Sequence, residues 1–156
     1  MYCPFCNIQS NLSRTNFNVR IVGKHCLSIE DQFPVSKGHH LIIPHRHVNS
    51  IWELTDEELM DVFAVMVETK NWIVDTYNPD GFNIGINQGD AAGQTIPHLH
   101  IHIIPRYRGD VANPKGGVRG VIPWKQEYVP LFTGDEETED DPFGILGALE
   151  ARRWKV

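Results

Sequence analysis

The sequence lacks a long hydrophobic run. None of its apolar stretches approaches the ~20 residues that a membrane-spanning helix requires. The first residues, Met1-Tyr2-Cys3-Pro4, have neither the basic nor the apolar region of a signal peptide. We therefore expect a cytoplasmic protein with no membrane partner.

An excess of basic residues is also missing. The 156-residue chain has a formal net charge of −6, from 14 basic and 20 acidic residues. Six of the acids lie within residues 135–141, an acidic run that we interpret as a solvated loop, and the remainder is balanced at 14 acids against 14 bases. Since nonspecific nucleic-acid binding depends on a basic face, the composition does not support a nucleic-acid partner.

Cysteine is scarce, with three residues in the chain. At 156 residues and 41% hydrophobic content, the chain is long enough to bury a core without disulfides, so we expect a single domain over residues 1–156. A Gly-x-x-x-x-Gly-Lys-Ser/Thr phosphate-binding loop is absent. Any phosphate site must therefore be built from other residues.

The most informative segment is residues 97–105, which reads Pro-His-Leu-His-Ile-His-Ile-Ile-Pro. Strict alternation predicts a β-strand with neighbouring imidazoles about 7 Å apart. Three histidines would share one face and three aliphatic residues would face the core: His98, His100 and His102 against Leu99, Ile101 and Ile103. Six ring nitrogens on one face are costly to satisfy, which favours a functional interpretation.

The segment His98-Leu99-His100-Ile101-His102-Ile103-Ile104 resembles the His-φ-His-φ-His-φ-φ signature (φ, hydrophobic) of the histidine triad (HIT) family of nucleotide hydrolases and transferases. The likeness extends upstream through Asn87, Gly93-Gln94-Thr95, Gly38-His39 and Asp31, and it covers most of residues 3–109. Relatives of this kind are homodimers whose sheets join side by side. The resemblance therefore implies an enzyme that is itself a homodimer.

Local patterns predict the remaining elements. Residues 16–30 indicate a hairpin, residues 40–43 a short buried strand and residues 82–87 another strand. Thr55 and Glu58 form a capping-box pattern that begins a helix ending at about residue 77. Together with the resemblance, these patterns predict an α+β, HIT-like fold: an antiparallel meander sheet of about five strands and one main helix over about 55–77. A core over about 3–109 is followed by a basic glycine-rich loop, the acidic loop and a short C-terminal helix within 110–156.

The resemblance implies cleavage at the α-phosphate of a nucleotide through a covalent nucleotidyl-histidine. His100 would be the nucleophile, because a neutral imidazole is available for attack near neutral pH. His102 would stabilise a phosphate oxygen or assist the leaving group, and His98 would orient the site from outside. This chemistry needs no metal.

The upstream positions would bind the substrate. The resemblance places Asp31 on the ribose, although a turn-capping aspartate is the alternative from the residues alone. His39 would lie beside the phosphates. Gln94 and Thr95 would bind nonbridging and leaving-group oxygens, and Asn87 would support them.

Several substrates and functions remain open. His102 occupies a triad position where transferases and phosphorylases often carry Gln, so dinucleoside polyphosphates such as diadenosine tetraphosphate come first and nucleoside phosphoramidates second. Some transferase activity is compatible with the same site. One alternative is a zinc-dependent hydrolase, because His-x-His on a strand can chelate a metal. Another is a noncatalytic nucleotide-binding protein.

Cys3-Pro4-Phe5-Cys6 is open to three interpretations: a redox pair, half of a zinc site, or two unrelated thiols. Zinc needs two further ligands, for which the chain has eight histidines. The resemblance supplies a set, since some relatives hold a structural zinc at the positions that correspond to Cys3, Cys6, His47 and His98. We therefore expect structural Zn²⁺ here.

The segment after the triad is rich in glycine and basic residues. Its four bases could contact distal phosphates or simply be surface residues: Arg106, Arg108, Lys115 and Arg119. Trp124 follows this segment, and we expect it near the substrate or the dimer partner rather than in the core.

Overall fold

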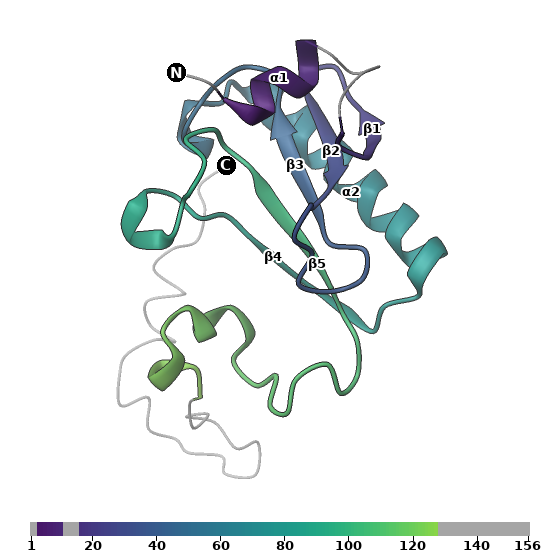
Figure 1. Ribbon diagram of the computed structural model, residues 1–156, viewed down its shortest axis with the longest axis vertical. Coiled ribbons are helices and arrows are strands. Elements are labelled where there is room, and N and C mark those ends of the chain that lie inside the picture. The colour runs from purple at the N-terminus through teal and green to yellow at the C-terminus, as the bar shows by residue number, and fades with distance from the viewer. Residues whose placement is uncertain (1–2, 11–15, 128–156) are drawn as a thin grey trace, which may run out of the picture.

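The computed structural model describes residues 3–10 and 16–127 of the chain. Its centre is an antiparallel sheet with the strand order β1-β2-β3-β5-β4 (Figure 1). The strands are β1 (Val19–Val22), β2 (Cys26–Glu30), β3 (His40–Pro44), β4 (Gly81–Gly85) and β5 (Ile101–Arg106). The predicted α+β fold is confirmed, whereas the acidic loop and the expected C-terminal helix lie outside the described residues.

The first three strands form the expected meander. β2 and β3 are paired in register over their full length, for example Leu27 with Ile43 and Glu30 with His40. Nearly every residue of these two strands is buried, because the sheet is covered on both faces. β3 therefore gives the site a rigid support.

The main helix, α2 (Asp56–Tyr77), begins where the capping box predicts. Thr55 Oγ1 accepts a hydrogen bond from the Glu58 backbone N–H at 3.3 Å, and the Glu58 carboxylate accepts one from the Thr55 N–H at 2.8 Å. The helix ends at Asn78, which adopts the left-handed conformation with φ 47°. α2 carries the chain past the sheet to β4, so that β5 returns between β3 and β4 and the simple meander ends at β3.

The two faces of the sheet have separate cores. On one face, α2 residues such as Val62 and Ile73 pack against Ile42, Ile101 and Ile103 of the strands. On the other face, a short helix, α1 (Pro4–Ser10), packs Phe5 and Ile8 against β2 and β3. Figure 1 shows α1 and α2 on opposite sides of the sheet. α1 is an element without a sequence prediction, although Pro4 at the first helical position is a recognisable start signal.

The triad strand is shorter than predicted. β5 begins at Ile101, whereas the alternation predicted a strand from His98 onward. The reason is that hydrogen bonds outside the sheet hold the preceding residues: Leu99 N–H donates to the Val48 carbonyl and His98 N–H to the Ile96 carbonyl. Leu99, Ile101 and Ile103 are nevertheless buried, as predicted.

The remaining elements are short 3-10 helices. η1 (Ile51–Glu53) and η2 (Asp90–Ala92) lie in the connections before α2 and before the triad. After β5 the chain leaves the sheet and forms η3 (Gly117–Val121) and η4 (Pro123–Lys125), as Figure 1 shows. Trp124 in η4 is 80% exposed and outside the core, as expected, and its contact with a substrate or a partner stays a prediction. Within the described residues, no helix is both long enough and apolar enough to cross a membrane.

Candidate active site

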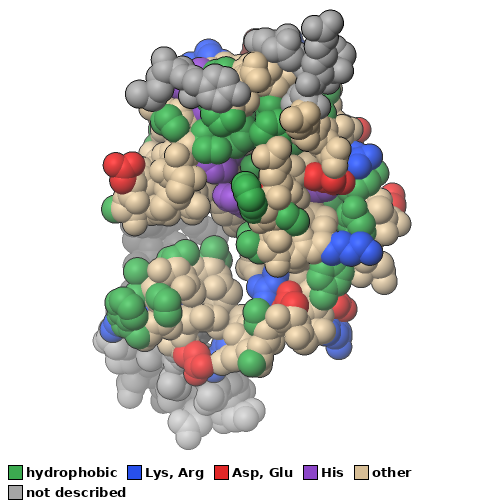
Figure 2. Space-filling model, in the orientation of Figure 1, with side chains coloured by type: hydrophobic (Ala, Val, Ile, Leu, Met, Phe, Trp, Pro, Cys, Tyr) green, Lys and Arg blue, Asp and Glu red, His purple; other side chains and the backbone are tan. Residues whose placement is uncertain are grey.

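The three histidines lie at the point where the chain enters β5, on the face opposite α2. His98 is fully buried, His100 is 6% exposed, and the His102 side chain is 21% exposed. The rings of His100 and His102 lie with their centroids 5.1 Å apart in an edge-to-face arrangement. Histidine side chains (purple) reach the surface on the face that Figure 2 shows. The site is therefore open at His102 and closed behind His98.

The His100 ring has a defined tautomer. Its Nδ1 lies 2.9 Å from the carbonyl oxygen of His98. Since a carbonyl can only accept, Nδ1 carries the hydrogen and Nε2 holds the lone pair. The hydrogen bond at Nδ1 therefore leaves Nε2 as the nucleophilic nitrogen. The same bond stabilises the positive charge that the ring would carry during attack.

The His98 ring has the opposite tautomer. Its Nε2 lies 3.0 Å from the Pro44 carbonyl oxygen, so Nε2 donates and Nδ1 holds the lone pair. Nδ1 faces the thiols of Cys3 and Cys6 at 3.4 and 3.6 Å. Burial lowers the pKa of His98, which keeps this ring neutral. His98 therefore connects the triad with the N-terminal cysteines.

His39 and His102 form a directed hydrogen-bond chain. The Val35 backbone N–H donates to His39 Nδ1 at 3.3 Å, so His39 Nε2 carries the hydrogen. That Nε2–H donates to His102 Nδ1 at 3.0 Å. In the neutral His102 ring the hydrogen is consequently on Nε2, a buried atom with no hydrogen-bond partner among the described residues.

Electrostatics keep His102 neutral. Burial, followed by the neighbouring rings of His100 and His39, lowers its pKa from 6.5 to about 4, while Asp31 acts in the other direction. Burial also lowers the pKa of His39. At neutral pH, His102 thus offers an uncharged Nε2–H donor.

The two carboxylate oxygens of Asp31 have different contacts. Its Oδ1 accepts the Phe33 backbone N–H at 2.8 Å, which is the turn-capping role. Its Oδ2 lies 3.5 Å from His39 Nε2 and 4.0 Å from His102 Nδ1. The carboxylate thus borders the triad while it shapes the loop before β3.

Asp31, His39 and His102 are close enough together to resemble a metal site, with one ligand atom each within 4.8 Å of the others. The tautomer of His39 argues against that function. Its Nε2, the atom that would have to bind the metal, carries a hydrogen because Val35 N–H occupies Nδ1. We therefore describe this group as a hydrogen-bond chain.

The loop before the triad places the three polar candidates differently. The Gln94 side chain is engaged at both ends: its oxygen accepts the Gly89 N–H at 2.8 Å and its nitrogen donates to the Asn49 carbonyl at 3.0 Å. Thr95 is exposed and Asn87 is partly buried, and neither side chain bonds to a described residue. Gln94 therefore braces the loop, whereas Thr95 and Asn87 remain available to a ligand.

His39, which the resemblance places beside the phosphates, is almost completely buried. It is 3% exposed, and both ring nitrogens are occupied, by Val35 and His102. Its geometry favours an indirect role through His102.

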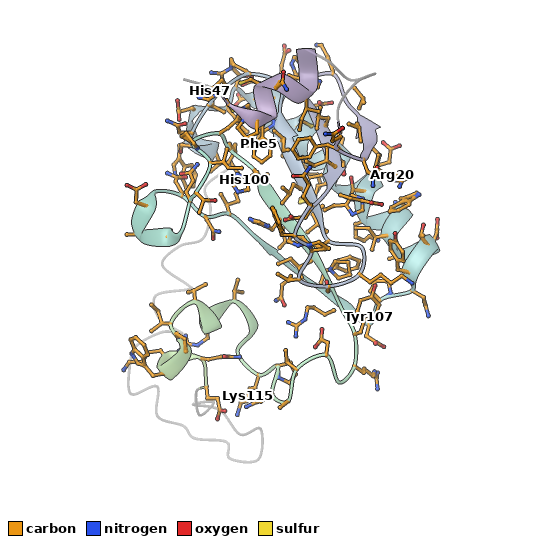
Figure 3. The ribbon with its side chains drawn as sticks, in the orientation of Figure 1. Phe5, Arg20, His47, His100, Tyr107 and Lys115 are labelled. Atoms are coloured by element: carbon orange, nitrogen blue, oxygen red, sulfur yellow. The ribbon has the colours of Figure 1, made fainter. Side chains whose placement is uncertain are left out.

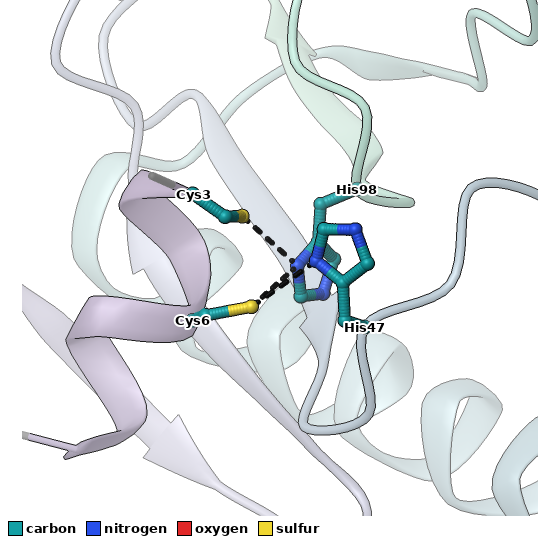
Figure 4. A group of neighbouring side chains, drawn as sticks. All are labelled: Cys3, Cys6, His47 and His98. Atoms are coloured by element: carbon teal, nitrogen blue, oxygen red, sulfur yellow. Dashed lines mark hydrogen bonds between the residues drawn. The ribbon is translucent and has the colours of Figure 1, made fainter. Parts of the chain in front are cut away.

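Four side chains form a thiol–imidazole cluster, shown in Figure 4: Cys3, Cys6, His47 and His98. Besides the His98 contacts, Cys6 Sγ lies 3.1 Å from His47 Nδ1. One ligand atom from each residue lies within 4.8 Å of the others. In a tetrahedral zinc site, sulfur and nitrogen ligands at the usual bond lengths are about 3.5 Å apart. The donor types, the distances and the lone pair on His98 Nδ1 all fit zinc.

Phe5 is a residue of the site that the sequence analysis missed. It is 2% exposed, and its ring packs against those of His98 and His100 with centroids 5.8 and 5.4 Å apart. Figure 3 shows Phe5 of α1 next to His100. The only signal in the sequence was its position between the two cysteines.

Of the four basic residues at and after the end of β5, Arg106 and Arg119 are held by contacts within the protein. Arg106 pairs with Asp110 at 2.7 Å, and Arg119 donates to the carbonyl oxygens of Lys125 and Gln126. Arg108 lies 3.3 Å from Asp80 but is 91% exposed. For Arg106 and Arg119 these contacts favour the surface interpretation over contact with distal phosphates.

Parts of this sequence match a known protein family and curated relatives. Residues 16–109 match the HIT domain family. The chain belongs to that family. It is 41% identical over 88 residues to "Protein hit" of Bacillus subtilis, covering 56% of this chain and 61% of that protein. It is 43% identical over 77 residues to a bis(5'-nucleosyl)-tetraphosphatase (asymmetrical) of Schizosaccharomyces pombe, covering 49% of this chain and 42% of that protein. The chain thus spans less than two thirds of both relatives.

Solved HIT structures match over a larger part of the chain. A HIT family protein from Bacillus anthracis superposes with a TM-score of 0.65 at 29% identity, covering 98% of this chain and 97% of that one. A zinc-bound histidine triad protein from Mycobacterium smegmatis gives 0.64 at 32% identity, covering 72% and 81%. The likeness to these solved structures thus covers a larger share of the chain than the family match over residues 16–109.

Proposed function

We propose that this protein hydrolyses dinucleoside polyphosphates at the α-phosphate through a covalent nucleotidyl-His100 intermediate. The observation that carries the proposal is the tautomer of His100, whose Nδ1–H is bonded to the His98 carbonyl and whose Nε2 lone pair is left for attack. Family membership supports the same class of chemistry.

The proposed reaction has two displacements. In the first, His100 Nε2 forms a bond to the α-phosphorus, the bond to the leaving phosphate oxygen breaks, and that oxygen takes the electron pair. The His98 carbonyl stabilises the positive charge that the ring then carries. In the second, water attacks the same phosphorus, the N–P bond breaks, and the water loses a proton to the solvent or to a phosphate oxygen.

His102 would act as a neutral donor in both displacements. Its low pKa prevents it from serving as an imidazolium acid at neutral pH, but its Nε2–H can bond to a phosphate oxygen as negative charge develops. Thr95 and Asn87 would contact other oxygens of the substrate, and Asp31 would accept from the ribose hydroxyls.

Two observations support the substrate class. The S. pombe relative is named as a tetraphosphatase of bis-nucleosyl compounds. The last triad position is His102 rather than Gln, which resembles hydrolases more than transferases. Nucleoside phosphoramidates are the second candidate, because the same nucleophile would displace an amine from the α-phosphorus.

For the thiol–imidazole cluster we propose structural zinc, bound by Cys3, Cys6, His47 and His98. The zinc-bound relative supports the proposal. All four ligands would come from the protein, which leaves no position for a reactive water. The alternative of a zinc-dependent hydrolase is therefore disfavoured at this cluster, and insensitivity of turnover to EDTA tests the point.

We propose a homodimer formed through the β4 edge. β4 is a terminal strand of the sheet, and beside it lies an apolar groove of about 340 Å³ lined by residues such as Phe63, Met66 and Ile84. Phe63 and Ile84 are 57% and 44% exposed. A second copy could continue the sheet and cover this groove. Sedimentation should give a dimer that Phe63→Glu converts to monomer, and a wild-type monomer would refute the assembly.

An activity panel tests the function. Diadenosine tetraphosphate and adenosine phosphoramidate would be compared with wild-type, His100→Asn and Thr95→Ala proteins. We expect the tetraphosphate to be preferred, His100→Asn to bind nucleotide but lose turnover by several orders of magnitude, and Thr95→Ala to lose about tenfold for one hydrogen bond. Binding without turnover in the wild type would instead identify a noncatalytic nucleotide-binding protein.

A further inference from the structure

We propose that Phe5 is a positioning residue for His100, holding the imidazole in the orientation that directs Nε2 outward. The proposal rests on the proposed function, because it assigns His100 as the nucleophile. It adds a residue from α1, outside the triad and the nucleotide-binding loops, to the groups that determine the rate.

The ring contacts carry the argument. Phe5 is 2% exposed, and its ring lies edge-on to His100 at 5.4 Å and 65°, and to His98 at 5.8 Å and 83°. These are the distances and angles that aromatic pairs prefer. One side chain thus packs against the proposed nucleophile and against the histidine whose carbonyl accepts the Nδ1 hydrogen of that nucleophile.

The hydrogen bond and the second ring–ring contact of His100 both come from its own stretch of chain. The hydrogen-bond acceptor is the carbonyl two residues before it, and the second ring contact is His102, two residues after it. A single hydrogen bond at Nδ1 allows the ring to tilt about the bond direction. Phe5, which comes from a separate helix, restricts that tilt.

α1 itself is anchored on both sides of Phe5. Cys3 and Cys6 place their sulfur atoms 3.4 and 3.6 Å from His98 Nδ1. Ile8, one turn later, is 1% exposed in the same core cluster as Phe5. The Phe5 ring therefore cannot move away from His100 without displacing the helix or the thiol–imidazole cluster.

A matched pair of variants separates positioning from stability. Phe5→Leu keeps an apolar side chain but removes the ring contact with His100, and Phe5→Met is a second variant of the same kind. Ile8→Val removes a similar volume from the same helix and the same core cluster, and Ile8, being aliphatic, makes no ring–ring contact. Both changes should lower Tm by similar amounts.

Two readouts are taken on metal-replete, full-length protein. The first is the kcat and KM for diadenosine tetraphosphate. For Phe5→Leu we expect kcat to fall about tenfold or more with KM changed less than about twofold, because misorientation of a reacting group affects the rate more than binding. Ile8→Val should keep kcat within about twofold of the wild type.

The second readout needs no substrate. In ¹⁵N-histidine NMR spectra, His100 should give one set of ring resonances in the wild type and in Ile8→Val, and broadened or doubled resonances in Phe5→Leu. Equal kcat and equal His100 spectra in the two variants would overturn the proposal. If the wild type showed no hydrolysis, the proposed function would fail, and the NMR comparison alone would decide whether Phe5 positions His100.

Discussion

His39 Nε2 donates a hydrogen bond to His102 Nδ1 across 3.0 Å, and the direction of this bond is set by Val35, whose backbone N–H occupies the other nitrogen of His39. A buried histidine thereby fixes which nitrogen of its neighbour carries the hydrogen. His102 is left with its hydrogen on Nε2, the group that we propose bonds to a phosphate oxygen as negative charge develops.

Replacing His39 should affect turnover through His102. His39→Leu removes the donor, so His102 can adopt either tautomer, and we expect kcat to fall about tenfold, the equivalent of about 1.4 kcal/mol. His39→Gln can still donate from its amide to His102 Nδ1 and should recover most of that loss. Steady-state kinetics on both variants check this. Equal loss in both variants would indicate a packing role only.

The neutral state of His102 can be measured directly. We expect its imidazole resonances to titrate with a midpoint near pH 4, because burial and the neighbouring rings lower its pKa from 6.5 to about 4. The unfolded chain takes up this proton below pH 6.5 while the folded protein does not, so the contribution of His102 to stability is present above pH 6.5 and lost as the pH falls toward 4. An NMR titration with a midpoint near 6.5 would contradict the assignment.

Glu58 should make stability depend on pH in the acid range. It completes the capping box and pairs with Arg46 at 2.7 Å, and these bonds lower its pKa from 4.5 to about 2. Because the folded pKa is the lower one, the stabilisation is present above pH 4.5 and is lost as the pH falls toward 2.

We expect Glu58→Gln to lower the free energy of unfolding by about 2 kcal/mol at pH 7 and to flatten its pH dependence between 4.5 and 2. Urea denaturation at several pH values measures both effects. Glu57→Gln is the control, since that side chain is 78% exposed and should change stability by less than about 0.5 kcal/mol. Similar losses in the two variants would count against the capping-box assignment.

The thiol–imidazole cluster predicts one zinc ion per chain. Cys6→Ser should abolish zinc in elemental analysis and lower Tm, because the proposed metal would join α1 to the triad segment. Cys26→Ser is the comparison: Cys26 is buried in the α2 core, away from the cluster, so the variant should lose stability but retain its zinc. Wild-type protein without zinc, even when refolded with the metal, would refute the site.

Local signals accounted for much of the fold. Thr55, Glu58 and the apolar spacing located α2 because a capping box and a helical period are both properties of neighbouring residues. The alternation predicts a start of β5 that is too early, because it continues back to His98, where the Pro44 carbonyl holds the side chain and the chain has not yet entered the sheet. That bond depends on the tertiary structure and leaves no mark in the sequence.

In the candidate site, too, some features could be predicted from the sequence and others depend on tertiary contacts. The triad and the four residues of the thiol–imidazole cluster could be located from residue types and family resemblance. The contact of His39 with His102 depends on the pairing of β3 with β5, in which Leu41 lies opposite His102, and the contact of Phe5 with His100 depends on how α1 packs on the sheet. Both are long-range relationships that periodicity does not encode.

The covalent role of His100 is tested most directly by the stereochemical course at phosphorus. The substrate would be a dinucleoside polyphosphate whose α-phosphorus is made chiral by a sulfur atom and by oxygen isotopes. The wild-type protein would hydrolyse it, and the configuration of the nucleotide product would then be determined. Two in-line displacements, by His100 Nε2 and then by water, predict net retention of configuration. Inversion would show a single direct attack by water and would contradict the nucleotidyl-histidine mechanism.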